Sequence, residues 1–198
     1  MSTDIRELDR RAVRTSVEVV SLVTADDLGR ATPCSEWTLG DLLAHMTVQH
    51  LGFASAAAGG GANPAVWRLR PLGDDPASAY ADAADHVLAA FAEEGALNRE
   101  FSLPEISTSQ TVPAAQAIGF HLVDYVVHGW DVARSLGVSF ELDPDVAEEA
   151  LRIALAVPDG LDRLGPGSAF RPSQPAPAGA SQLSRIVSAL GRSPSWPR

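Results

Sequence analysis

HLVDYVVHGWD, residues 121–131, lies within a long apolar stretch of this 198-residue sequence, yet it contains two histidines and two aspartates. Apolar side chains cover most of the circumference of a helix that we predict from residue 113 to residue 137. A helix that is apolar nearly all round is usually central and buried. The segment therefore predicts an all-α protein built around this helix.

The polar residues of this helix are not scattered. His121, Asp124 and His128 are spaced i, i+3 and i+7 and so share one face, with Asp131 at its edge. A lone carboxylate in an apolar core costs several kcal/mol unless it is paired, hydrogen-bonded or bound to a cation. Asp124 and His128 are one turn apart, which lets both side chains reach one ion.

A neighbouring helix must supply a third ligand, and His45, at the border of an apolar stripe, is the best candidate. Two histidines and one carboxylate with an open position form a known set for zinc or ferrous iron. A metal-free hydrogen bond between Asp124 and His128 explains the same spacing, and periodicity alone slightly favours it. His121 is two turns from His128, so we predict that His121, with Asp131 and Trp130, lies behind the ligands or lines a pocket.

The remaining periodicity predicts five further helices. Thr38 and Asp41 resemble a capping box, Pro76 suits a first helical position, and Asp143 is the expected cap of the fifth helix. The expected ranges are 5–23, 39–58, 76–94, 143–157 and 181–192, with a short hairpin at 99–112 and a Pro/Gly-rich loop at 165–180. We expect one domain over residues 1–198: an antiparallel four-helix bundle over about 4–137 with short C-terminal additions over about 138–198.

Composition excludes several classes of protein. The formal net charge of −10 and the lack of a basic run argue against a nucleic-acid binder. No apolar run reaches the length of a membrane span, and the charged N-terminus lacks the core of a signal peptide. A single cysteine, Cys34, rules out an intrachain disulfide. We expect a cytoplasmic protein, monomeric or homodimeric.

Other conspicuous residues have simpler interpretations than a catalytic role. Cys34 has no adjacent base in the sequence and is expected to be an inert thiol. Trp37 and Trp130 are expected to be packing residues, although an aromatic ring beside the metal would suit a ligand pocket. His50 is expected to be a core histidine and His86 a solvated one. The glycine triplet 59–61 lacks a following lysine, which excludes a phosphate-binding loop.

Three segments, TPCSEWTLGDLLAHM (32–46), HLVDYVVHGWDVARSLG (121–137) and LGRSPSW (190–196), resemble the mycothiol-dependent maleylpyruvate isomerase-like proteins of the DinB-like superfamily. Within it they are most similar to a group of uncharacterised single-domain metal-binding members. The resemblance implies a DinB-like bundle with a divalent metal, zinc in the isomerase, held by a histidine and a carboxylate-x-x-x-histidine pair. Those roles fall on His45, Asp124 and His128.

Two departures limit what the resemblance implies. The isomerase has Glu where this chain has Asp124, and it carries a C-terminal domain with a catalytic Arg for which this sequence has no room. We therefore do not expect maleylpyruvate isomerisation. We expect a metal-dependent enzyme that presents a small thiol, by resemblance mycothiol, to a small electrophilic substrate in a transferase or isomerase reaction. Metal-dependent hydrolysis and a non-catalytic metal- or ligand-binding protein remain as alternatives.

Overall fold

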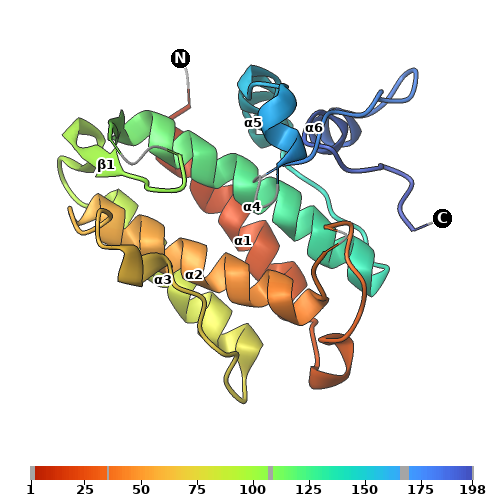
Figure 1. The fold of residues 1–198 in the computed structure, drawn as a ribbon, viewed down its shortest axis with the longest axis horizontal. Coiled ribbons are helices and arrows are strands. Elements are labelled where there is room, and N and C mark those ends of the chain that lie inside the picture. Colours follow the sequence, from red (N-terminus) through yellow and green to blue (C-terminus); the bar gives the residue numbers. More distant parts are fainter. Residues whose placement is uncertain (1–2, 35, 107–108, 166–169, 198) are drawn as a thin grey trace.

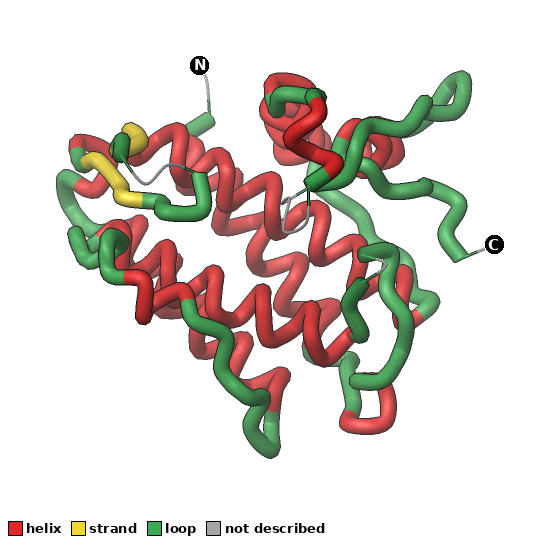
Figure 2. The backbone as a smooth tube through the Cα atoms, viewed as in Figure 1, coloured by secondary structure: helices red, strands yellow, loops and turns green. Residues whose placement is uncertain are grey.

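The computed structural model describes residues 3–34, 36–106, 109–165 and 170–197. Its long helices form the four-helix bundle that the sequence predicts (Figure 1; Figure 2). Helices α1 and α4 run side by side in one direction, and α2 and α3 run together in the other (Figure 1). The bundle helices are α1 (Ile5–Val20), α2 (Leu39–Ala57), α3 (Pro76–Ala92) and α4 (Ala114–Leu136).

Two further helices, α5 (Pro144–Ala156) and α6 (Gln182–Ala189), pack against each other, and α5 also packs against α1 and α4. The strands β1 (Glu100–Ser102) and β2 (Thr111–Pro113) pair antiparallel in the predicted hairpin region. Short 3-10 turns complete the described elements: η1 (Ala25–Asp27), η2 (Pro64–Trp67), η3 (Ala96–Asn98) and η4 (Leu161–Leu164).

The helix ends follow local chemistry that is visible in the sequence. Thr38 and Asp41 form the predicted capping box at the start of α2, with Thr38 Oγ1 accepting from the Asp41 amide at 3.2 Å. Pro76 occupies the first turn of α3, where a missing N–H costs nothing. Gly137 ends α4 in the left-handed region, at φ 74°, which glycine adopts without strain.

Two details differ from the sequence prediction. Helix α1 ends at Val20, three residues before the predicted end, and the chain turns so that Val23 packs against the core. Asp143 occupies the N-cap position of α5, but its side chain makes no cap hydrogen bond. Its carboxylate instead accepts from Arg11 Nη1 of α1 at 2.9 Å, so an ion pair between helices replaces the predicted cap.

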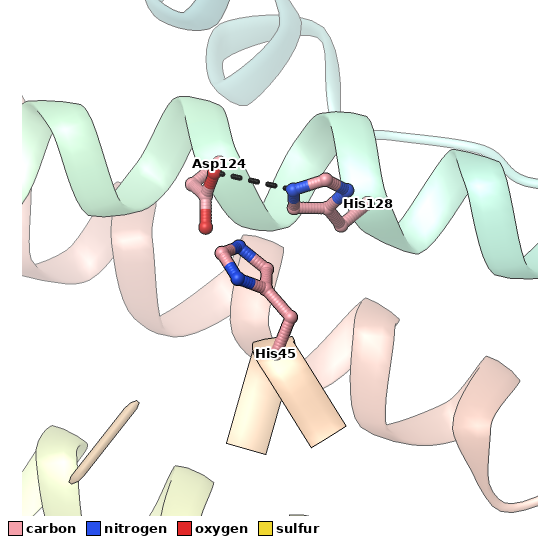
Figure 3. A group of neighbouring side chains, drawn as sticks. All are labelled: His45, Asp124 and His128. Carbon is pink, nitrogen blue, oxygen red and sulfur yellow. Dashed lines mark ion pairs between the residues drawn. The ribbon is translucent and has the colours of Figure 1, made fainter. Parts of the chain in front are cut away.

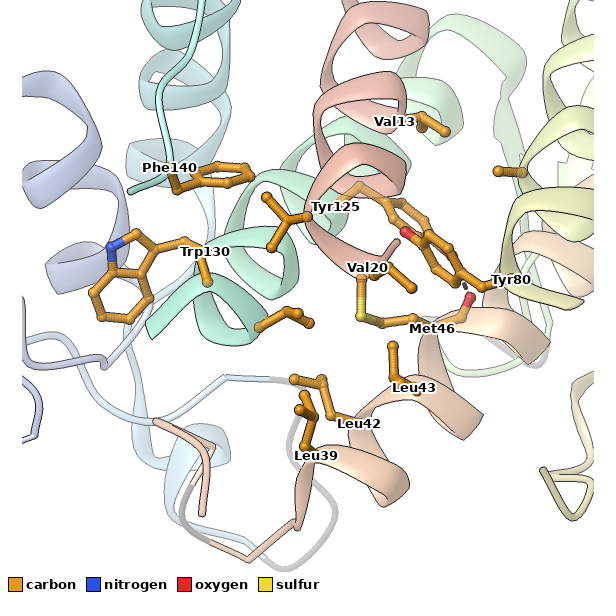
Figure 4. Packing of buried hydrophobic residues seen from close by; sticks show 14 of the residues in the cluster. Val13, Val20, Leu39, Leu42, Leu43, Met46, Tyr80, Tyr125, Trp130 and Phe140 are labelled. Atoms are coloured by element: carbon orange, nitrogen blue, oxygen red, sulfur yellow. Dashed lines mark hydrogen bonds between the residues drawn. The ribbon is translucent and has the colours of Figure 1, made fainter. Parts of the chain in front are cut away.

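The core lies between the four bundle helices, where large apolar side chains from α2, α3 and α4 meet (Figure 4). Tyr80 and Tyr125 are fully buried there, and each hydroxyl has a partner, as buried phenols require. Tyr125 Oη donates to the Met46 carbonyl at 2.5 Å, and Tyr80 Oη lies 2.6 Å from Ser16 Oγ. The first bond joins α4 to α2, the helices that carry the predicted ligands, and the second joins α3 to α1.

No helix in the described ranges is both long enough and apolar enough to cross a membrane.

Candidate metal centre

His45 projects from α2 toward Asp124 and His128 on α4 (Figure 3). One ligand atom from each of the three residues lies within 4.8 Å of the others. Within α4, His128 Nε2 is 3.4 Å from Asp124 Oδ1. These three residues, which we call the trio, thus lie close together across two helices.

Burial differs among the trio. The His128 side chain is 3 % exposed and the Asp124 side chain 22 %, so the carboxylate marks the side that opens to solvent. Burial lowers the pKa of His45 to about 4. The His45 imidazole is therefore uncharged at neutral pH and has a free lone pair, which is the form that binds metals.

The donor set fits a divalent metal ion. Two ligands that each lie about 2.1 Å from one ion are at most about 4.2 Å apart, so small side-chain rotations would bring the trio into range. Two imidazoles and a carboxylate leave at least one position open in a tetrahedral site. That combination suits zinc or ferrous iron better than magnesium or calcium, which prefer oxygen ligands.

Trp37, expected first as a packing residue, lies against the trio. Its ring centroid is 4.6 Å from that of His45 and 6.1 Å from that of His128. Trp130, which was considered as a pocket residue, instead packs in the core cluster with Phe140, and the Arg134 guanidinium lies 5.9 Å from its ring. The aromatic wall of the site therefore comes from the turn before α2.

Asp131 supports His128 from behind. Its Oδ2 lies 3.0 Å from His128 Nδ1 and 3.1 Å from Arg192 Nη2. Burial raises the pKa of Asp131, but the Arg192 charge and the bond with His128 outweigh it and hold the pKa below its ordinary value. An ionised carboxylate only accepts, so His128 Nδ1 is the donor in this contact, and Nε2, 3.4 Å from Asp124 Oδ1, is the nitrogen that faces the trio.

His121 lies elsewhere, contrary to its predicted place behind the ligands. It is fully buried, with Nδ1 2.7 Å from Asp9 Oδ1 and Nε2 3.1 Å from His50 Nδ1. Its position on α4, one turn before Asp124, points it at α1 and the end of α2 rather than at His45. We call Asp9, His50 and His121 the central network.

Two polar groups of this region, Asp9 and the Gln49–Glu105 pair, were not predicted from the sequence. Asp9 is spaced four residues from both Ile5 and Val13 of the apolar stripe on α1, and that spacing could have revealed it. Gln49, one turn after His45 on α2, donates to both oxygens of Glu105 at 3.2 and 3.0 Å. Glu105 comes from the loop after β1, so no helical periodicity could have placed it.

Three other predictions concern single residues. His50 is fully buried and His86 exposed, as expected. Cys34 is partly buried, and burial raises the pKa of its thiol, which disfavours the reactive thiolate. Whether Cys34 is dispensable stays a prediction.

Fold and site together define a helical-bundle protein with a candidate two-histidine, one-carboxylate metal centre. Residues 10–133 match the family model described as "Mycothiol maleylpyruvate isomerase N-terminal domain", and the chain belongs to this family. Two uncharacterized proteins of Mycobacterium tuberculosis, MT0763 (strain CDC 1551 / Oshkosh) and Rv0738 (strain ATCC 25618 / H37Rv), are each 33 % identical over 189 residues. The match covers 92 % of this chain and 94 % of each relative.

The solved structures agree on the fold. The crystal structure of the mycothiol-dependent maleylpyruvate isomerase is similar with a TM-score of 0.58 and 18 % identity, over 79 % of this chain and 68 % of that chain. A histidine-to-alanine mutant of that isomerase matches with the same TM-score and coverage and 16 % identity. The fold is therefore the DinB-like bundle of that enzyme.

Proposed function

We propose that the trio binds a divalent metal, with zinc as the favoured ion, and that the protein uses it to present a small thiol to an electrophilic substrate. The observation that carries this proposal is the convergence of His45, Asp124 and His128 within 4.8 Å of one another. By family, the thiol is mycothiol. The reaction class that fits is thiol transfer or thiol-assisted isomerisation.

A divalent cation supplies one piece of chemistry here: it lowers the pKa of a coordinating thiol, so that thiolate is available near neutral pH without a strong base. The residues of the chain do the rest. His45 is held uncharged by burial, and Asp131 keeps the His128 lone pair directed at the trio. Trp37 covers His45 and excludes water from one side of the site.

The partly exposed Asp124 side gives ligands a route to the trio. Gln49, one turn further along α2, and its partner Glu105, from the loop after β1, add a polar wall on which hydroxyl or amide groups of a thiol ligand can bind. A substrate electrophile held beside the thiol would then react in a favourable geometry. The identity of the electrophile is open to a substrate screen.

Calorimetry tests this proposal. Mycothiol titrated into zinc-loaded protein should bind and release about one proton near pH 7, because a thiol of ordinary pKa about 8.5 becomes a thiolate. The proton count comes from repeating the titration in buffers of different ionisation enthalpy. Metal-free protein and the Asp124→Ala variant should show neither signal, whereas His86→Ala, at an exposed histidine, should behave as wild type.

If zinc binds but mycothiol and simpler thiols give no heat and no proton release, the thiol proposal is wrong. Metal-assisted hydrolysis would then be tested first, with ester and amide substrates and no added thiol. If zinc binds and neither assay shows turnover, a metal- or ligand-binding protein without catalysis is the remaining alternative.

A further inference from the structure

The C-terminal segment reaches the candidate metal centre through one buried arginine. Arg192 follows α6 and lies beyond residues 10–133, the part that matches the family model. It is 4 % exposed, and its Nη2 donates to Asp131 Oδ2 at 3.1 Å. That same oxygen accepts from His128 Nδ1. Arg192, Asp131 and His128 thus form an unbroken chain of contacts that ends at the trio.

Asp131 depends on Arg192 for its orientation. The carboxylate is fully buried, and among the described residues its Oδ1 has no hydrogen-bond partner. Both of its side-chain contacts therefore fall on Oδ2, one from the histidine that it must orient and one from Arg192. Without the guanidinium, only His128 would hold the carboxylate, which could then rotate or turn toward water.

Arg192 is itself fixed in place. Its Nη1 donates to the Leu190 carbonyl at 3.0 Å, and its guanidinium lies 5.7 Å from the centroid of the Phe170 ring. The segment around it is also attached at a second point, because Arg134 Nε on α4 donates to the Trp196 carbonyl at 2.8 Å. Among the described residues, Arg192 Nε is buried without a hydrogen-bond partner, so Nη1 and Nη2 make the contacts of the guanidinium. A carboxylate that is itself held by a donor orients a metal-binding histidine more precisely.

We propose that Arg192 is a positioning residue of the metal centre: it fixes Asp131, so that His128 keeps its hydrogen on Nδ1 and turns its Nε2 lone pair to the trio. The proposal deepens the proposed function and rests on it for the metal. It assigns to the C-terminal segment a part in the site that the matched family domain does not contain. Arg192 acts through Asp131 and touches neither metal nor substrate.

The tautomer of His128 gives a readout in metal-free protein. Long-range ¹H–¹⁵N NMR separates the Nδ1–H and Nε2–H forms, and the His128 signal is assigned by its absence in His128→Gln. Wild type should show the Nδ1–H form. Arg192→Met, which keeps the apolar stem but removes the donors, should show a mixture of both forms, and Arg192→Lys should restore much of the wild-type signal. A wild-type His128 in the Nε2–H form would overturn the proposal without any Arg192 variant.

Zinc affinity, measured by competition with a chromophoric chelator, is the second readout. Arg192→Met should weaken binding about 10-fold or more, the scale seen when the partners of metal-ligating histidines are lost. Arg134→Met is the matched control, because it also removes an arginine that holds the C-terminal segment on α4 but does not contact Asp131. It should change neither the tautomer nor the affinity.

The outcomes separate the two proposals. A folded Arg192→Met protein with wild-type tautomer and wild-type zinc affinity would overturn the positioning role. Equal losses in Arg192→Met and Arg134→Met would also overturn it, because attachment of the segment would then explain the effect. If wild type binds no zinc, the proposed function fails, and the tautomer alone still decides what Arg192 does.

Discussion

The trio and the central network contain the same residue types, two histidines and one aspartate each, and both take one histidine from α2 and one from α4. In the central network, His121 lies between Asp9 and His50 at 2.7 and 3.1 Å, and all three side chains are fully buried. In the trio, one ligand atom of each residue lies within 4.8 Å of the others, and the Asp124 side chain is 22 % exposed. Composition therefore does not separate a structural polar network from a candidate metal centre, but geometry and access do.

The largest expected effect is on zinc binding. Asp124→Ala should weaken zinc affinity at least about 100-fold, since it removes one of three ligands. The metal-free variant should stay helical. Asp124→Leu is a partner variant: it removes a carboxylate from a mostly apolar helix and should not lower stability. Zinc competition assays and circular dichroism melts measure both quantities.

A substitution in the central network should affect zinc affinity much less than one in the trio. Asp9→Ala should leave zinc affinity within about threefold of wild type, because none of its contacts reaches the trio. Equal stabilisation by zinc in wild type and Asp124→Ala would remove Asp124 from the ligand set. A large loss of zinc affinity in Asp9→Ala would show that the two sets of residues are not independent.

Stability should show the opposite pattern. Asp9→Ala should lower the free energy of unfolding by about 3 kcal/mol, because it leaves Nδ1 of the fully buried His121 without its partner. His86→Ala, at an exposed position, should change it by less than about 0.5 kcal/mol. Urea unfolding of the metal-free proteins measures both. A loss below about 1 kcal/mol for Asp9→Ala would mean that the network contributes little to stability.

Much of this could be predicted from the sequence, for a physical reason. Helix periodicity and caps are local, so the bundle, the Thr38 capping box and the end of α4 at Gly137 were predictable. Asp124 and His128 were predictable as neighbours because one helical turn joins them. Pairing across helices depends on packing, and the contacts of His121 with α1 and of Asp131 with Arg192 follow from no local rule.

Residue spacing alone could not place His45 beside Asp124 and His128. The family resemblance suggested this position for His45, and it depends on how the helices pack. Its place on α2 made it a candidate, and only the arrangement of α2 against α4 brings it to the other two residues. From the sequence, Trp37 and Trp130 have the same expected packing role. In the structure, Trp37 comes from the turn before α2 and lies against the trio histidines, whereas the Trp130 ring lies beside Arg134. A side chain in an irregular turn has no periodicity from which its direction can be predicted.

Acid should destabilise the metal-free protein through both sets of residues. Burial lowers the pKa of His45 to about 4 and that of His50 well below its ordinary value. The unfolded chain therefore takes up these protons first, so stability present at neutral pH is lost as the pH falls below about 6.5. Each histidine adds at most about 1.4 kcal/mol per pH unit to the slope.

A histidine variant tests which residue causes this pH dependence of stability. Between about pH 4 and 6.5, His45→Gln should reduce the slope of the unfolding free energy against pH by the equivalent of up to one proton. Zinc should steepen the dependence in wild type only, since protons compete with the metal for the trio. An unchanged slope in His45→Gln would show that His45 is not held uncharged in the folded protein.

The smallest effect is expected at Cys34. Its thiol is partly buried and has a raised pKa, and the turn places it near the Arg192 end of the site rather than in the trio. Cys34→Ser should keep zinc affinity and any thiol-dependent turnover within about threefold of wild type. A collapse of turnover with zinc retained would instead make Cys34 a nucleophile and weaken the proposal of an external thiol.

X-ray absorption spectroscopy of the zinc-loaded protein tests the central claim most directly. We predict one zinc per chain with only nitrogen and oxygen ligands at about 2.0–2.2 Å, including two imidazoles. Addition of mycothiol should bring in one sulfur ligand at about 2.3 Å. A sulfur ligand before any thiol is added, a first shell without imidazole, or a first shell that does not change with mycothiol would contradict the account.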